Sequence, residues 1–96
     1  MKTKIICTIG PASVKPSVLE NLIKDGMDIA RINFSHGDYK QYLKIIRDVR
    51  SISKKLNKKT SIMCDLQGAK IRIASFKRFP KKLHDGKTVI LVPSNC

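Results

Sequence analysis

The stretch MDIARINFSHGD, from Met27 to Asp38, decides the fold of this chain. Its first half is apolar and β-branched, which predicts a strand, and its second half carries the polar side chains of Asn33, Ser35 and His36. Polar groups directly after a buried strand are expected in a parallel sheet, because the loops after parallel strands gather at one edge and form the site there. The segment therefore predicts a parallel sheet with a functional carboxyl edge.

Strand and helix patterns alternate on both sides of this segment. The predicted elements are strands over residues 4–9, 27–34 and 61–65 and helices over residues 14–24 and 39–56. We expect Gly26 to follow the first helix as its C-cap and Asp38 to be the N-cap of the second. The apolar positions of the second helix are Tyr39, Tyr42, Leu43, Ile46, Val49, Ile52 and Leu56. Strands separated by helices predict right-handed βαβ crossovers and a parallel sheet.

The pattern changes after Lys70. Residues 71–76 (IRIASF) are typical of a strand with no helix behind it, and residues 83–92 (LHDGKTVILV) indicate a turn at Asp85 and Gly86 that leads into another strand. A helix-free β segment after three parallel strands predicts a second domain. We therefore divide the chain into residues 1–74, part of an α/β domain, and residues 75–96, the start of an all-β domain.

Composition and charge limit the classes of partner. The 96 residues carry 20 Lys and Arg against 7 Asp and Glu, a formal net charge of +13, which favours a polyanion such as nucleic acid. The basic residues are scattered, however, and two clusters at residues 54–59 and 77–82 fall at element ends without interleaved aromatic residues. No apolar run approaches the ~20 residues of a membrane helix. We expect neither a nucleic-acid nor a membrane partner.

The cysteines and the N-terminus indicate a cytoplasmic protein. Cys7, Cys64 and Cys96 are an odd set without CxxC spacing, so neither a disulfide framework nor a zinc cluster is predicted. Cys7 and Cys64 are expected to lie on the first and third strands as core residues. The N-terminal segment lacks the pattern of a targeting peptide.

A cluster of chemically useful side chains is expected at the carboxyl edge of the sheet. The strand-end residues that should meet there are Asn33, Ser35, His36 and Asp65. Their hydroxyl, amide and carboxylate oxygens, with loop carbonyls, are ligands suited to K⁺ or Mg²⁺. Arg31 and Arg72 add forks that can hold phosphate through two hydrogen bonds. Each residue alone is more often a cap, a turn or an edge residue, but together they favour phosphoryl chemistry.

Three segments resemble the start of the pyruvate kinase family: KTKIICTIGPAS (2–13), LIKDGMDIARINFSHGD (22–38) and CDLQGAKIR (64–72). The resemblance implies a (β/α)₈ TIM barrel, of which this chain supplies the first three strand–helix units, with a small all-β domain inserted after the third strand. It also implies phosphoryl transfer from phosphoenolpyruvate to ADP, giving pyruvate and ATP, in a homotetramer.

The resemblance also implies roles for particular residues. Arg31 matches the arginine that holds the substrate phosphate. The positions that match the nucleotide site are Asn33, Phe34, Ser35, His36 and Arg72. The positions that match the monovalent-cation site are Asn33, Ser35, Asp65 and the backbone carbonyl of Leu66. The catalytic lysine and the Mg²⁺ ligands of the family would lie outside this chain.

The loop after the third strand departs from the family pattern. Many members have Thr-Lys-Gly-Pro-Glu where this chain has LQGAK (66–70), so the acidic residue is replaced by Lys70. In the family, a lysine here goes with catalysis that does not require K⁺, because its ammonium group supplies the charge of the cation. We therefore expect weak or absent K⁺ dependence.

The chain is expected to be the N-terminal part of such a protein, as a truncated product, one part of a split gene or a partial record. It would be inactive alone, and marginally stable or aggregation-prone because three strands leave an open edge.

Two other hypotheses remain open for the chain at this stage. It could instead be a non-catalytic remnant that binds phosphate or nucleotide, or that pairs with a full-length subunit. A polyanion-binding role would show steep salt dependence that does not involve Arg31.

Overall fold

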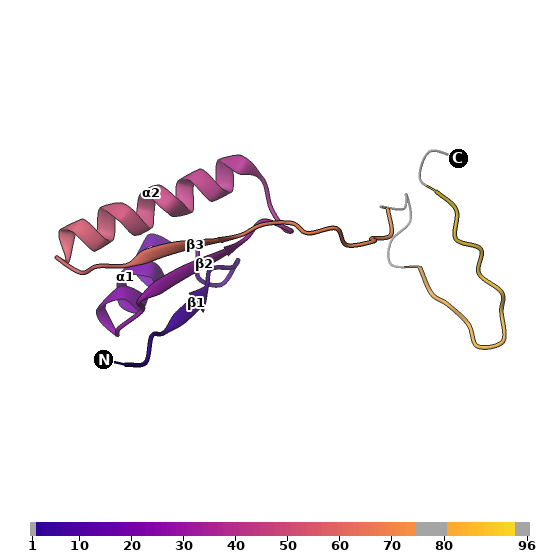
Figure 1. The fold of residues 1–96 in the computed structure, drawn as a ribbon, viewed down its shortest axis with the longest axis horizontal. Helices are drawn as coiled ribbons and strands as arrows, with labels where there is room; N and C mark the ends of the chain where they lie inside the picture. Colours follow the sequence, from indigo (N-terminus) through magenta and orange to yellow (C-terminus); the bar gives the residue numbers. More distant parts are fainter. Residues whose placement is uncertain (1, 75–80, 94–96) are drawn as a thin grey trace.

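The elements follow one another in the predicted order (Figure 1). The structure is a computed structural model that describes residues 2–74 and 81–93. Its elements are β1 (Ile6–Thr8), α1 (Pro16–Lys24), β2 (Ile29–Asn33), α2 (Tyr39–Lys55) and β3 (Ser61–Asp65). The prediction of three strands and two helices in residues 1–65 is thus confirmed, although β1 and β2 are shorter than the apolar runs that predict them.

The three strands form one parallel sheet in the order β1-β2-β3. Thr8 of β1 is the register partner of Arg31 in β2, and Arg31 is in turn the partner of Met63 in β3. Two residues further on, Asn33 is paired with Asp65. Because alternate residues of a strand share a face, Arg31, Asn33 and Asp65 lie on the same face of the sheet at its carboxyl edge.

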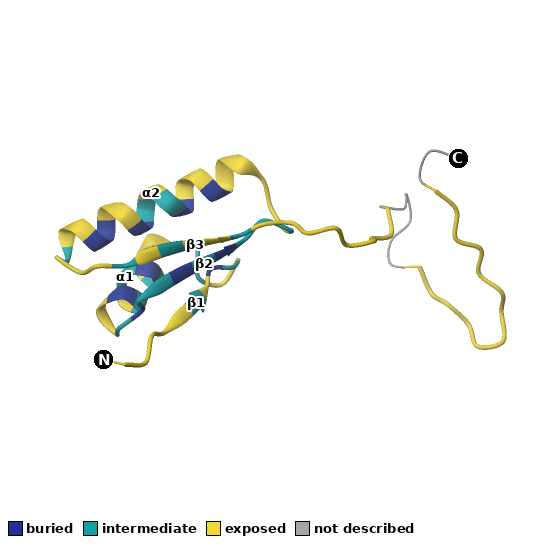
Figure 2. Ribbon diagram, in the orientation of Figure 1, coloured by how far each residue is buried: buried dark blue, intermediate teal, exposed yellow. Residues whose placement is uncertain are grey.

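The core lies between the sheet and the two helices, which pack against each other (Figure 2). Ala30 and Ile32 of β2 are buried there. The helix residues buried with them are Leu19, Ile23, Tyr42, Ile45, Val49 and Ile52. The predicted apolar stripe of α2 was partly wrong: Leu43 is 51% exposed and Ile45 only 7%, because Ile45 lies one turn from Tyr42 and Val49 on the buried face.

The other face of the sheet is bare within the part of the chain that the structure describes. Ile6 is half-exposed and Met63 is also open to solvent on this face. Cys7 packs against the core, but Cys64, on the last strand, is exposed, so the prediction that it is a core residue was wrong. A sheet face without cover is what an unfinished barrel presents.

The predicted N-cap of α2 is confirmed, whereas the C-cap of α1 is Asp25 and Gly26 is the residue after it. The backbone N–H of Gln41 donates a 2.9 Å hydrogen bond to Oδ1 of Asp38, the N-cap of α2. Gly26 follows α1 with φ of +112°, a left-handed conformation that favours glycine. These two residues therefore fix where α2 begins and where the chain leaves α1.

The predicted β segment does not form in the residues that the structure describes. Residues 66–74 and 81–93 contain no helix or strand, although the turn at Asp85 and Gly86 is present. The strand predicted over 71–76 was wrong for 71–74, and residues 75 and 76 lie outside the described residues. A strand needs a hydrogen-bonded neighbour, and these two stretches pair with no strand among the described residues. The division at residues 74 and 75 stays a prediction.

None of the helices within residues 2–74 and 81–93 combines the length and the apolar composition that crossing a bilayer requires.

Candidate functional site

Arg31 is held between the two neighbouring strands at the carboxyl edge. Its Nη1 donates a 3.0 Å hydrogen bond to Oγ1 of Thr8 on β1. Its Nε donates a 3.1 Å hydrogen bond to Oδ2 of Asp65 on β3, and Nη2 donates to the same oxygen. The Arg31 side chain is 30% exposed, so the ion pair is only partly shielded from water. The central position of β2 in the sheet brings these three side chains together.

The loops after β2 and β3 are joined by hydrogen bonds. The backbone N–H of Phe34 donates to the carbonyl of Asp65 at 2.9 Å, and Nε2 of Gln67 donates to the carbonyl of Phe34 at 2.8 Å. Within the first loop, the backbone N–H of Ser35 donates to Oδ1 of Asn33 at 3.0 Å. The two loops therefore form one connected structure beside the Arg31 ion pair.

The first turn of this loop rests on helix α2. The Tyr42 hydroxyl donates a hydrogen bond to the carbonyl of His36, and the Tyr42 ring lies 4.3 Å from that of Phe34, centroid to centroid. Gly37 has φ of +94°, and a Cβ atom there would lie 2.8 Å from Oε1 of Gln41. A side chain at this position would therefore be strained in its backbone and would displace its neighbours.

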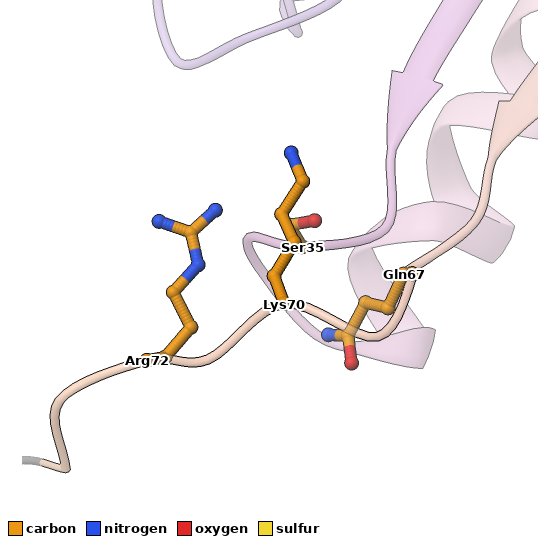
Figure 3. Close-up of a pocket in the computed structure, with 5 residues that line it drawn as sticks. Ser35, Gln67, Lys70 and Arg72 are labelled. Carbon is orange, nitrogen blue, oxygen red and sulfur yellow. The ribbon is translucent and has the colours of Figure 1, made fainter.

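A small pocket lies beside the two loops (Figure 3). Its volume is about 110 Å³, and it is lined by Ser35, Gln67, Gly68, Lys70 and Arg72. The side chains of Lys70 and Arg72 extend toward the same side of the loop after β3. Because two cationic groups and a hydroxyl face this small space, it is chemically suited to an anion.

The structure brings most of the predicted site residues together, but in two groups. Arg31 is paired with Asp65, whereas Ser35 shares the pocket with Arg72 and Lys70. Phe34 directs its ring to Tyr42, so only its backbone lies along the loop edge. The prediction of a single cluster at the carboxyl edge is therefore refined into an arginine ion pair and an adjacent cationic pocket.

Two of the side chains predicted as cation ligands lie on neighbouring strands, and each already accepts a hydrogen bond. Asn33 and Asp65 are register partners, Oδ1 of Asn33 accepts from Ser35, and Oδ2 of Asp65 accepts from Arg31. Hard oxygen donors of this kind suit K⁺ in their chemistry. Across residues 2–74 and 81–93, no group of three His, Cys, Asp or Glu side chains gathers in a way that would hold a metal ion.

Sequence reasoning missed three residues of this site. Thr8 contacts Arg31, Gln67 bridges the two loops, and Tyr42 supports the first of them. The place of Thr8 in the site could have been predicted, because it is a polar residue at the end of a strand, like Asn33 and Asp65. That of Tyr42 could not, since its helical position predicts only a core residue.

Comparisons with known proteins agree on one family. The family model described as pyruvate kinase, barrel domain, matches residues 1–95. The chain is 44% identical over 90 residues to the pyruvate kinase of Thermococcus litoralis, covering 94% of this chain and 19% of that protein. It is 47% identical over 88 residues to that of Staphylococcus saprophyticus, covering 92% and 15%.

A solved structure of a pyruvate kinase from Cryptosporidium parvum is also similar, with a TM-score of 0.62 and 41% sequence identity. The match covers 65% of this chain and 13% of that one. The chain thus spans less than a fifth of the length of these relatives. The segments that carry the resemblance, the three parallel strands and these matches together show that the chain belongs to the pyruvate kinase family, within its barrel domain.

Proposed function

We propose that this chain forms one edge of the active site of a pyruvate kinase, which transfers a phosphoryl group from phosphoenolpyruvate to ADP. The observation that carries the proposal is the Arg31 ion pair at the carboxyl ends of three parallel strands. This edge is where barrel enzymes place their active sites. Arg31 would hold the substrate phosphate through N–H groups that Thr8 and Asp65 leave unused.

The cationic pocket supports a nucleotide-binding role for the loops after β2 and β3. Ser35 and Arg72 line it, Asn33 ends β2 beside it, and Phe34 and His36 belong to the loop that follows. A guanidinium and an ammonium group side by side would neutralise the charge of a diphosphate. The nucleotide proposal therefore depends on Arg72 and Lys70 more than on the exposed His36.

We also propose that the reaction depends only weakly on K⁺, because of Lys70. The family's cation ligands match Asn33, Ser35, Asp65 and the carbonyl of Leu66, and a bound cation would neutralise phosphate charge there. Lys70 and Ser35 line the same pocket, so the Lys70 ammonium group is available to supply that charge instead. The Mg²⁺ of the family would be held by residues outside this chain.

We further propose that residues 1–96 alone do not catalyse the reaction. The sheet face that carries Arg31 and Met63 is uncovered in the described chain, and barrel chemistry requires residues from several other strands. The complete enzyme would be a cytoplasmic homo-oligomer, as the family resemblance implies. The rest of the barrel would both cover this face and complete the site.

A chimaeric enzyme tests the proposal directly. Residues 1–96 would replace the matching segment of the Staphylococcus saprophyticus pyruvate kinase, and phosphoryl transfer would be measured at varied phosphoenolpyruvate. We expect the chimaera to be active and Arg31→Ala to lower kcat/KM for phosphoenolpyruvate by roughly 100-fold, about 2.7 kcal/mol. Arg47→Ala, an exposed arginine on α2, is the matched control and should have no effect. Full activity of Arg31→Ala would contradict the proposal.

The same chimaera tests the role of Lys70. Its rate should be similar in K⁺ and in Na⁺, whereas Lys70→Glu should make the rate depend on K⁺, because the substitution replaces the fixed positive charge by a carboxylate. The measurement is the rate in each salt at equal ionic strength. A rate in K⁺ many times that in Na⁺ for the unsubstituted chimaera would contradict the proposal.

The cationic pocket also favours a second candidate function, in which the chain binds phosphate or nucleotide without catalysis. Lys70 and Arg72 both come from this chain, so the pocket does not need the rest of the barrel. Calorimetry of residues 1–96 with ADP distinguishes the two candidates. Tight binding that Arg72→Ala abolishes, in a chimaera without activity, would favour the binding role.

A further inference from the structure

We propose that Thr8 is a positioning residue, which sets the orientation of the Arg31 guanidinium toward the substrate phosphate. The inference rests on the proposed function of Arg31 and extends it to a residue on a different strand. Thr8 is the last residue of β1 and the register partner of Arg31. Its hydroxyl therefore faces the arginine from the strand opposite to Asp65.

Asp65 alone cannot fix the direction of the guanidinium. Both of its hydrogen bonds with Arg31, from Nε and from Nη2, end on the same oxygen, Oδ2. A single oxygen acts as a pivot, about which the planar group can still turn. The 3.0 Å hydrogen bond from Nη1 to Oγ1 of Thr8 holds the guanidinium at a second point, through the nitrogen that does not contact Asp65.

A count of the N–H donors of Arg31 shows how many of them remain for a ligand. An arginine carries five N–H donors, and within the described residues Thr8 and Asp65 take three of them. The remaining two are one N–H on Nη1 and one on Nη2. Two donors on adjacent nitrogens match two oxygens of a phosphate, and such paired contacts depend strongly on angle. Loss of the Thr8 contact would therefore weaken phosphate binding through misalignment.

The surroundings of Thr8 separate this role from a structural one. Thr8 is exposed and does not belong to the buried core, so its replacement creates no cavity. Valine has nearly the shape of threonine and an equal preference for strands but lacks the hydroxyl. Thr8→Val thus removes the hydrogen bond while it leaves β1 intact, and Thr8→Ser removes a methyl group while it keeps the hydrogen bond.

The test uses the active chimaera and steady-state kinetics with both substrates. We expect Thr8→Val to lower kcat/KM for phosphoenolpyruvate about tenfold, which is about 1.4 kcal/mol, and to leave KM for ADP unchanged. Thr8→Ser should restore most of the loss. In an Arg31→Ala background, Thr8→Val should have no further effect, since the group that it positions is absent.

The outcomes distinguish this inference from the proposed function. Equal losses in Thr8→Val and Thr8→Ser, or additive losses in the double variant, would overturn the positioning role. A large effect of Arg31→Ala with none of Thr8→Val would overturn it as well, while the proposed function of Arg31 would stand. If Arg31→Ala leaves kcat/KM for phosphoenolpyruvate unchanged, the proposed function itself fails.

Discussion

Residues 2–65 and the described residues that follow them, 66–74 and 81–93, contain similar apolar side chains but differ in what those side chains contact. In the first region, Leu19 and Val49 are completely buried between sheet and helices. In the second, every residue is exposed, and Ile90 and Leu91 are each 81% exposed (Figure 2). Both regions have β-branched or apolar runs, so the two regions differ in the contacts of these side chains and not in their type.

The comparison shows that an apolar segment forms a helix or strand only where other elements pair with it or pack against it. Three strands that alternate with two helices provide each other with hydrogen-bond partners and a shared core. The run over residues 87–92 has the strand pattern but no neighbouring strand among the described residues. The first region is therefore the part of this chain that carries its own stability, and the predictions below test that difference.

The largest effect is expected in the core. Leu19→Ala removes a completely buried side chain and should cost about 2–5 kcal/mol, which is a large fraction of the stability of a small domain. We expect the variant of residues 1–96 to lose most of its helical circular dichroism. Ile90→Ala, the matched control in the exposed region, should stay within about 0.5 kcal/mol. Equal losses in both variants would contradict the comparison.

A smaller effect is expected at the loop that supports the site. Gly37→Ala places a Cβ atom 2.8 Å from Oε1 of Gln41 at a φ of +94°, and should cost about 1–2 kcal/mol. Gly68→Ala is the control in the other region, because no atom lies within 4 Å of the added Cβ. The measurement is the temperature at which half of the helical signal is lost. An unchanged temperature for Gly37→Ala would show that this loop is not held by α2.

The smallest effect concerns the contact between the two helices. Hydrogen bonding to Lys24, with the charges of Lys24 and Lys55, lowers the pKa of Glu20 below its ordinary value of 4.5. A lowered folded-state pKa means that Glu20 stabilises the fold above its ordinary pKa, and that this contribution is lost as the pH falls through the folded value.

Thermal melts of residues 1–96 at decreasing pH measure this contribution. Glu20→Gln should reduce the loss of stability on acidification by a small amount, and Lys24→Gln should have a similar effect, because each variant removes the same pair. Lys24 is exposed and Glu20 is only partly buried, so added salt should also diminish the difference. A larger acid sensitivity in Glu20→Gln than in the unsubstituted chain would contradict the assignment.

The sequence predicts the first region well because its signals are local. The Asp38 cap, the glycine after α1 and the polar end of β2 each act within a few residues, and each lies where the pattern places it. The sequence also predicts that Arg31 and Asp65 meet at one edge of the sheet, although it does not predict that they form an ion pair. Parallel pairing brings strand ends together whatever the length of the helix between them.

The features that the sequence does not predict depend on contacts between different elements, which no local pattern encodes. The hydrogen bond from Tyr42 to His36 crosses from a helix to a loop, and the buried side of α2 is set by where α1 packs. The strand predicted after residue 70 failed because a strand is defined by its neighbour and not by its own residues. Residue patterns thus predict the elements, whereas tertiary contacts decide which of them form.

The order of strands in the sheet also has a consequence for synthesis on the ribosome. Each strand pairs with the strand that precedes it in the chain, and the intervening helix packs on the same core. The growing polypeptide can therefore add one strand–helix unit at a time to a sheet that already exists, without waiting for distant segments. Among the described residues, the free edges of β1 and β3 and the uncovered face beside Met63 are surfaces that such a nascent chain exposes to chaperones.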